Sequence, residues 1–172
     1  MSKVALRKEL SGMSKEQLMT LILDLYSARP QAKEYFEFFL DPDENALFDK
    51  YMKLIDKEVY RTKRGMMCGR VSIINNYIKD FASFGVSPSL VIDMTLQTAQ
   101  IIMALEKVYY MTTALSDAGI KLVLSALKRA DAAGLFVETK QRIDNMLEAS
   151  FVSQRYRRRL LESISEYATT MK

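Results

Sequence analysis

The stretch PSLVIDMTLQTAQIIMALEKVYYM, residues 88–111, decides the fold predicted for this chain. Pro88 suits the first position of a helix, which needs no backbone N–H donor, and Ser87 can act as its N-cap. Apolar residues then recur every three or four positions on two neighbouring faces. One face carries Val91, Met94, Thr98, Ile101, Leu105 and Val108, and the other carries Ile92, Leu96, Ala99, Met103 and Tyr110. Two apolar faces predict a central helix that other helices cover on more than one side.

The same stretch is long enough to cross a membrane, which is the alternative interpretation. Polar side chains are spread through it, and each would be costly in hydrocarbon. They are Asp93, Gln97, Gln100, Glu106 and Lys107. We therefore expect a core helix and no membrane contact.

Composition and capping signals extend this helical prediction to the whole chain. Six glycines and three prolines in 172 residues leave few turns for a β-sandwich, and the length fits a single domain over residues 1–172. Ser14 and Gln17 form a capping box, Asp41 is predicted to cap a helix with Glu44 reaching back, and Ser116-Asp117 to cap another. Helical spacing marks segments 3–10, 14–26, 30–40, 42–60, 71–84, 117–133, 135–149 and 153–171.

The predicted fold is therefore all-α, with about seven to eight helices around the central helix at residues 88–111. Two architectures remain open, a compact helical bundle and an irregular array of helical hairpins, because no repeat of fixed period is present. Residues 61–70, RTKRGMMCGR, contain two glycines and break the helical spacing, so they are predicted to form a loop.

The most informative count is that of histidine, which is zero. Without histidine there is no Ser-His-Asp or Cys-His catalytic arrangement, no His zinc ligand and no Glu-x-x-His pair of a di-iron bundle. The single cysteine excludes an internal disulfide, and the N-terminal MSKVALRKEL lacks the apolar core of a signal peptide. We expect a cytoplasmic protein with no cofactor and no metal.

Three candidate sites have simpler structural explanations. Asp41, Asp43 and Asn45 match the first positions of a calcium loop, but Ala46 and Met52 replace its glycine and glutamate, so helix capping explains them better.

Cys68 lies among arginines that can lower a thiol pKa, yet the segment Met66–Cys68 is better explained by packing into a neighbouring groove. Asp93 and Glu106 are 13 residues apart, about 20 Å along a helix, and cannot act as a catalytic pair. Nothing else has the spacing of an active site, so we predict no catalytic residues and disfavour an enzyme.

Positive charge is concentrated in two clusters. Residues 61–70 and 155–159 carry +4 each, while the remaining residues hold 17 basic and 21 acidic groups, a net of −4. The clusters consist of Arg61, Lys63, Arg64, Arg70, Arg155, Arg157, Arg158 and Arg159. Arginine suits phosphates and Tyr156 could stack on bases, which favours a nucleic-acid site. The alternative is a solvated face whose arginines pair with acids such as Glu162 and Glu166, or which steers an acidic protein partner.

Adjacent aromatic pairs give a second hint of a contact surface. The pairs are Tyr35-Phe36, Phe38-Phe39 and Tyr109-Tyr110. Neighbouring residues of a helix point about 100° apart, so one member of each pair can lie at an exposed edge while the other packs in the core. An exposed aromatic rim is typical of protein–protein contacts and homodimers.

The first half of the chain resembles an uncharacterised family of small bacterial proteins, a domain of unknown function. The resemblance rests on Leu18, Leu21–Tyr26, Ala32–Tyr35, Phe38–Leu40 with Pro42, and Lys79–Phe81 before Gly85, with a looser match at Gly134-Leu135. Pro30 departs from the family pattern, which has a non-proline helix former there. The resemblance implies an all-helical fold and no functional residues.

The sequence thus predicts a non-catalytic bacterial interaction protein that binds another protein or itself. The alternative is a weak nucleic-acid binder that uses the two basic clusters.

Overall fold

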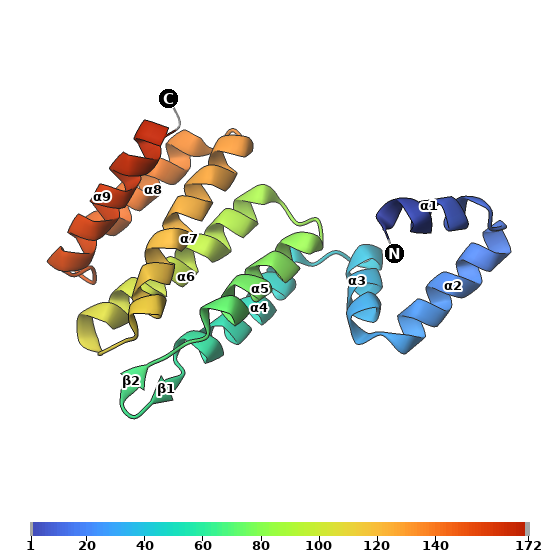
Figure 1. Ribbon diagram of the computed structural model, residues 1–172, viewed down its shortest axis with the longest axis horizontal. Helices are drawn as coiled ribbons and strands as arrows, with labels where there is room; N and C mark the ends of the chain where they lie inside the picture. Colours follow the sequence, from blue (N-terminus) through green and yellow to red (C-terminus); the bar gives the residue numbers. More distant parts are fainter. Residues whose placement is uncertain (1, 171–172) are drawn as a thin grey trace. The chain divides into compact units, whose positions relative to one another are not determined.

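The computed structural model describes residues 2–170, and over this range the chain forms nine helices and one short β-hairpin (Figure 1). The all-α prediction is confirmed, as an array of helical hairpins. Contacts group the chain into two compact units, Met1–Asp43 and Glu44–Lys172, called here the first and second units. The single domain expected over residues 1–172 stays a prediction.

The first unit contains α1 (Lys3–Ser11), α2 (Lys15–Ala28) and α3 (Pro30–Leu40). The predicted capping box of α2 is confirmed, because Ser14 Oγ accepts from Gln17 N–H at 3.2 Å and Gln17 Oε1 accepts from Ser14 N–H at 2.8 Å. Pro30 occupies the first helical position of α3, and Arg29 caps both α2 and α3 in extended conformation. Proline therefore separates two helices here instead of kinking one.

The second unit contains the remaining elements. They are α4 (Glu44–Val59), β1 (Thr62–Lys63), β2 (Met66–Met67), α5 (Val71–Ser83), α6 (Pro88–Val108), α7 (Thr113–Ala132), α8 (Phe136–Glu148) and α9 (Gln154–Thr170). Consecutive helices pack together, α4 on α5, α5 on α6, α6 on α7 and α7 on α8, while α9 also packs on α7. The most extensive helix contact joins α6 and α7, so these two helices form the centre of the unit.

The core of α6 agrees with the predicted faces except at its C-terminal end. Val91, Ile92 and Met103 are buried as expected, whereas Val108 is 70% exposed and Tyr110 is 86% exposed. These two predictions are wrong because α6 ends at Val108, before its last apolar positions can pack. The two predicted faces are the edges of one broad buried face.

Ile102, fully buried, lies at the centre of that broad face of α6. The polar residues of the face are satisfied locally. Thr95 and Thr98 donate their hydroxyls to the carbonyls of Val91 and Met94 at 2.7 Å. By length and composition α6 could cross a membrane, and 56% of its most apolar window is buried by the rest of the chain.

Residues 61–70 form a hairpin within what was predicted to be a loop. β1 and β2 pair antiparallel around Arg64 and Gly65, whose φ angles of 52° and 77° are those of a two-residue hairpin turn. The hairpin is fixed to the segment after α6, because Met67 N–H donates to the Tyr110 carbonyl at 2.8 Å and Thr112 N–H donates to the Met67 carbonyl at 3.0 Å.

Two predicted helix caps are wrong. Thr112 caps α7, with Leu115 N–H at 3.4 Å from its hydroxyl, so Ser116 and Asp117 lie inside the helix. The same cap chemistry was available one turn earlier.

The box predicted between Asp41 and Glu44 is also wrong. Asp41 ends α3, donating its N–H to the Glu37 carbonyl at 3.0 Å, and the Glu44 carboxylate accepts from Ser87 N–H at 2.9 Å. Ser87 precedes α6 as predicted, but its side chain makes no capping bond to the helix.

Candidate interaction surfaces

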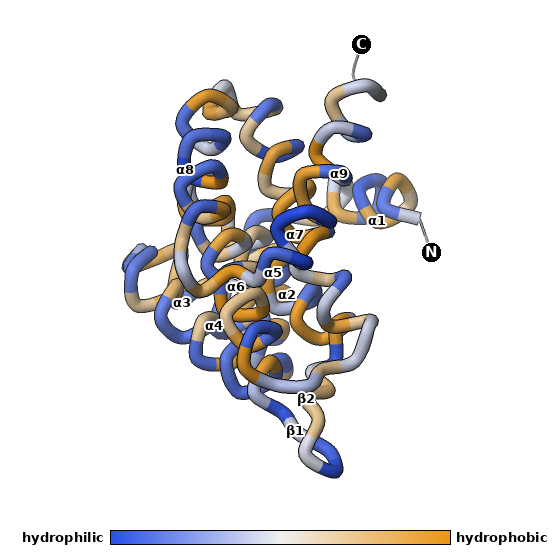
Figure 2. Tube along the Cα trace, turned by 90° about the vertical axis from the view of Figure 1, so that its left-hand side faces the viewer, coloured by the Kyte–Doolittle hydropathy of each residue, from blue (hydrophilic) through white to orange (hydrophobic). Residues whose placement is uncertain are grey.

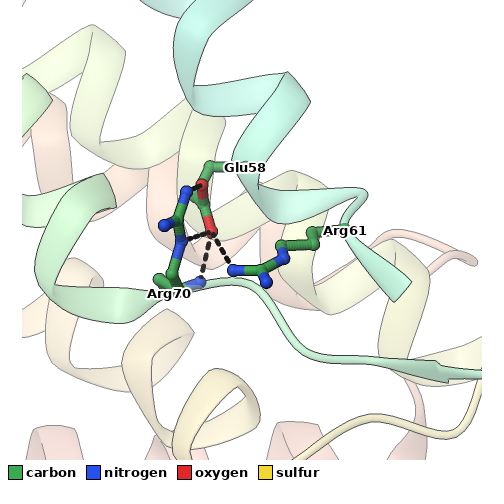
Figure 3. Close-up of polar contacts among 3 residues, drawn as sticks. All are labelled: Glu58, Arg61 and Arg70. Carbon is green, nitrogen blue, oxygen red and sulfur yellow. Dashed lines mark hydrogen bonds and ion pairs between the residues drawn. The ribbon is translucent and has the colours of Figure 1, made fainter. Parts of the chain in front are cut away.

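Two members of the first basic cluster, Arg61 and Arg70, pair with the buried carboxylate of Glu58 (Figure 3). Glu58 is 6% exposed, and its oxygens accept from Arg70 N–H and Nε at 2.8 Å and from Arg70 Nη2 at 2.6 Å. Arg61 lies 3.9 Å from the same carboxylate. The hydrogen bond from the Arg70 side chain is the main reason that the pKa of Glu58 lies below its ordinary value. Arg70 therefore links the C-terminal end of α4 to the start of α5.

The second basic cluster is anchored through Tyr156, which is fully buried. Its hydroxyl donates to the Ser116 carbonyl at 3.0 Å, and burial raises the pKa of this phenol well above its usual range, so the donor proton is retained. Gly119 makes room for the ring, because a Cβ there would collide with the Tyr156 hydroxyl. Arg159 forms an ion pair with Asp117 and donates to Ser116 Oγ at 3.1 Å. These contacts attach α9 to α7.

The other arginines of α9 point in different directions. Arg158 has a 79% exposed side chain and lies 3.6 Å from Glu162. Arg157 is half-buried, and its Nε has no hydrogen-bond partner within the part of the chain that the structure describes. Arg155 lines a groove beside α6. The four arginines therefore do not form one continuous basic face.

That groove has a volume of about 720 Å³ and lies where α6 ends, α7 begins and α9 begins. Its lining residues are Glu106, Lys107, Val108, Tyr109, Tyr110, Met111, Thr113, Ser116, Asp117, Arg155 and Arg159. Tyr109 and Tyr110 are 51% and 86% exposed, so both members of this pair lie at the edge, where only one was expected. The groove combines exposed aromatic surface with cationic groups, and Lys107 was not predicted as part of it because it lies in neither charge cluster.

The two basic clusters border the same segment, and half of their members are paired with acids. The hairpin carrying Lys63 and Arg64 is hydrogen-bonded to residues 110–112, and this segment lines the groove together with Arg155. Within residues 2–170 the side chains of Lys63, Arg64 and Arg155 form no hydrogen bond or ion pair. We call these three residues and the groove the basic end of the second unit.

The first unit has a different kind of surface. None of its described residues, 2–43, is buried. Its exposed large apolar residues are Val4, Leu6, Met13, Met19, Leu21, Ile22, Leu23, Leu25, Tyr35, Phe39 and Leu40. In α2, Leu21, Ile22 and Leu25 share a face, and in α3 Tyr35 and Phe39 are one turn apart. Figure 2 shows the apolar residues interleaved with polar ones along α2 and α3.

The acids near the central helix serve as attachment points for α8 and α9. Asp93 on α6 forms an ion pair with Arg142 on α8, and Glu106 accepts the Ser153 hydroxyl before α9 at 2.7 Å. Cys68 is half-buried at the base of the hairpin, where its N–H donates to the Arg61 carbonyl at 2.8 Å. Among the residues described, no three His, Cys, Asp or Glu side chains cluster to hold a metal ion. The carboxylates of Asp93 and Glu106 thus have structural partners, and Cys68 is held through its backbone.

The geometry defines a small all-helical protein with two exposed surfaces, one apolar and one basic with aromatic residues. Residues 1–168 match a family described as "Family of unknown function (DUF6155)", and the chain belongs to this family. No curated protein and no solved structure matches the chain.

Proposed function

We propose that this protein is a non-catalytic binding protein that docks the apolar faces of its first unit on another protein chain. The observation that carries the proposal is the burial pattern of residues 2–43, where no residue is buried and eleven large apolar residues are exposed. At these exposures eleven such side chains present on the order of 1,000 Å² of apolar surface. A partner in a standard interface contributes about 800 Å², so this surface suffices for a stable complex.

The charge distribution supports an acidic surface as the counterpart of the basic end. The second unit carries 19 basic and 14 acidic residues, a net charge of +5, and the first unit carries 6 and 7, a net of −1. Lys63, Arg64 and Arg155 would steer an acidic partner toward the protein, while apolar contacts would supply most of the affinity. A second copy of the chain is the partner that needs no further component, and it is tested first.

The test is sedimentation equilibrium between about 1 and 100 μM protein, at low and high salt. We expect a reversible dimer that weakens at high salt but persists, because salt screens its charge pairs and does not screen its apolar contacts. The variant Ile22→Ser/Leu25→Ser should dissociate to monomer, whereas Val137→Ser, which changes an exposed apolar residue of the second unit, should not. A monomer at every concentration would contradict self-association.

Nucleic-acid binding is a second candidate, favoured by the observation that both basic clusters border residues 110–112. Single-stranded RNA or DNA would place phosphates at Lys63, Arg64 and Arg155 and stack bases on Tyr109 or Tyr110. Binding to labelled oligonucleotides should then weaken steeply with salt through counterion release. The Lys63→Ala/Arg64→Ala/Arg155→Ala variant should lose binding and Arg158→Ala should retain it. No binding at low salt would remove this candidate.

A further inference from the structure

We infer that the docking partner is a second copy of this chain, whose α3 enters the groove at the basic end of the first copy. The inference rests on the proposed function, which requires only that the first unit docks on a protein. It goes further by naming the partner, the docking helix and the receiving site. Neither surface alone specifies an occupant. The two surfaces match each other in charge, in aromatic character and in size.

The receiving groove is cationic and partly aromatic. Arg159 and Asp117 neutralise each other by their ion pair, while Glu106 accepts from the Ser153 hydroxyl and keeps its negative charge. Lys107 donates to the Ser150 carbonyl and keeps its positive charge, and Arg155 adds a second cation, so the lining of the groove carries a net charge of +1. With Lys63 and Arg64 on the adjoining hairpin, this end of the unit favours an acidic occupant that can also cover Tyr109 and Tyr110.

Helix α3 and the residues after it have the complementary character. Residues 34–43, EYFEFFLDPD, contain four acidic residues and no basic residue, and the one basic residue of α3, Lys33, lies 3.8 Å from Glu37. Tyr35, Phe39 and Leu40 on the same helix are 43%, 69% and 78% exposed. Tyr35 and Phe39 are spaced i and i+4, which is how an amphipathic helix presents anchors to a groove. This is the one segment of the first unit that combines exposed aromatic residues with a run of acids.

The sizes of the two surfaces also agree. An 11-residue helix such as α3 is about 16 Å long. The groove volume of about 720 Å³ lies within the range of roughly 300–1,000 Å³ seen for binding pockets, enough for two large aromatic side chains.

Reciprocal docking of two copies would bury both surfaces twice in one assembly. Each copy would offer its α3 and receive the α3 of the other, so that one pair of chains makes both contacts and forms a two-fold dimer. A partner of another sequence would have to supply both complementary surfaces independently.

The inference is tested by reversing charge on one surface at a time and measuring mass by sedimentation equilibrium. The acid-reversed variant is Glu37→Lys/Asp41→Lys, and the base-reversed variant is Lys63→Glu/Arg155→Glu. Each alone should dimerise at least tenfold more weakly than the wild type, because like charges would face each other. An equimolar mixture should recover the dimer, since both reciprocal contacts then join opposite charges. The matched control Lys53→Glu/Lys128→Glu changes the same number of exposed basic residues elsewhere in the second unit and should dimerise normally.

Circular dichroism on each variant separates loss of docking from loss of fold, because a folded helical monomer is the expected product. Dimerisation of both reversed variants at wild-type strength would overturn the assigned groove while leaving the proposed self-association intact. A mixture that stays monomeric would overturn it as well. A wild-type monomer at all concentrations would overturn both the inference and self-association. If that monomer bound single-stranded RNA through Lys63 and Arg155, the second candidate function would replace them.

Discussion

The two units of this chain use apolar residues in opposite ways. In the second unit Ile55, Phe81 and Ile102 are fully buried, whereas no described residue of the first unit is buried and Phe39 is 69% exposed. Burial of an apolar side chain contributes about 1.5–3 kcal/mol relative to exposure, so the second unit supplies its own core. The first unit can gain comparable stabilisation only through contact with something else. Large apolar residues are thus buried in one unit and exposed in the other, and this difference is the basis of the proposed docking.

The largest expected effect comes from a matched pair of isoleucines, one from each unit. Ile102→Ala removes a fully buried side chain from α6 and should lower the free energy of unfolding by about 3 kcal/mol. Ile22→Ala changes a side chain that is 44% exposed on α2 and should cost the monomer less than about 0.5 kcal/mol. Guanidinium unfolding of dilute protein measures both. If the two variants lost equal free energy of unfolding, the contrast between the units would be contradicted.

The next effect concerns two glutamates whose pKa values both lie below the ordinary 4.5, Glu58 in the second unit and Glu16 in the first. A lowered folded-state pKa contributes stability that is present above the unfolded pKa and is lost as pH falls through the folded pKa. Glu58 should therefore make the second unit less stable below about pH 4.5, and Glu58→Gln should flatten that dependence.

The pKa of Glu16, which lies on a fully exposed helix turn, is lowered chiefly by a backbone hydrogen bond. Glu16→Gln is the control, and it should leave the acid limb of the second unit's unfolding profile unchanged, because Glu16 belongs to the first unit. The profiles are measured by thermal unfolding at a series of pH values. An unchanged profile in Glu58→Gln would show that the pair with Arg70 is not coupled to folding.

The smallest expected effect tests how α9 is attached. Tyr156→Phe removes the hydroxyl that donates to the Ser116 carbonyl and leaves the ring in place. A buried hydrogen bond contributes about 1 kcal/mol, so unfolding of the second unit should become easier by about that amount. Tyr60→Phe, at a 54% exposed position, should change nothing measurable in the same denaturation experiment. If Tyr156→Phe leaves the free energy of unfolding unchanged, α9 is held by its apolar contacts alone.

The sequence predicted the fold well because its helix signals agree with one another. Pro30 and Pro88 begin helices, Ser14 caps α2, and the spacing in residues 88–111 identified most of the buried face of α6. The errors lie where the sequence offers a second local signal, such as another capping residue or a turn. Thr112 capped α7 before Ser116, and the Arg64-Gly65 turn made a hairpin that helical spacing could not reveal.

The candidate surfaces were only partly predictable, since charge clusters do not show which members are paired. Arg70 pairs with Glu58 and Arg159 pairs with Asp117. Because the partners are distant in the sequence, residue spacing could not predict either pair. The adjacent tyrosines Tyr109-Tyr110 did indicate an exposed edge. What could not be predicted was the end of α6 at Val108, which turns those tyrosines into a groove wall.

The central claim is that the first unit is exposed in the monomer and covered in the complex. Amide hydrogen exchange of the wild-type protein at about 1 and 100 μM tests this claim directly. We predict that the amides of α2 and α3 become markedly more protected at the higher concentration, while those of α6 stay equally protected. Protection of α2 and α3 that does not depend on concentration would contradict the account.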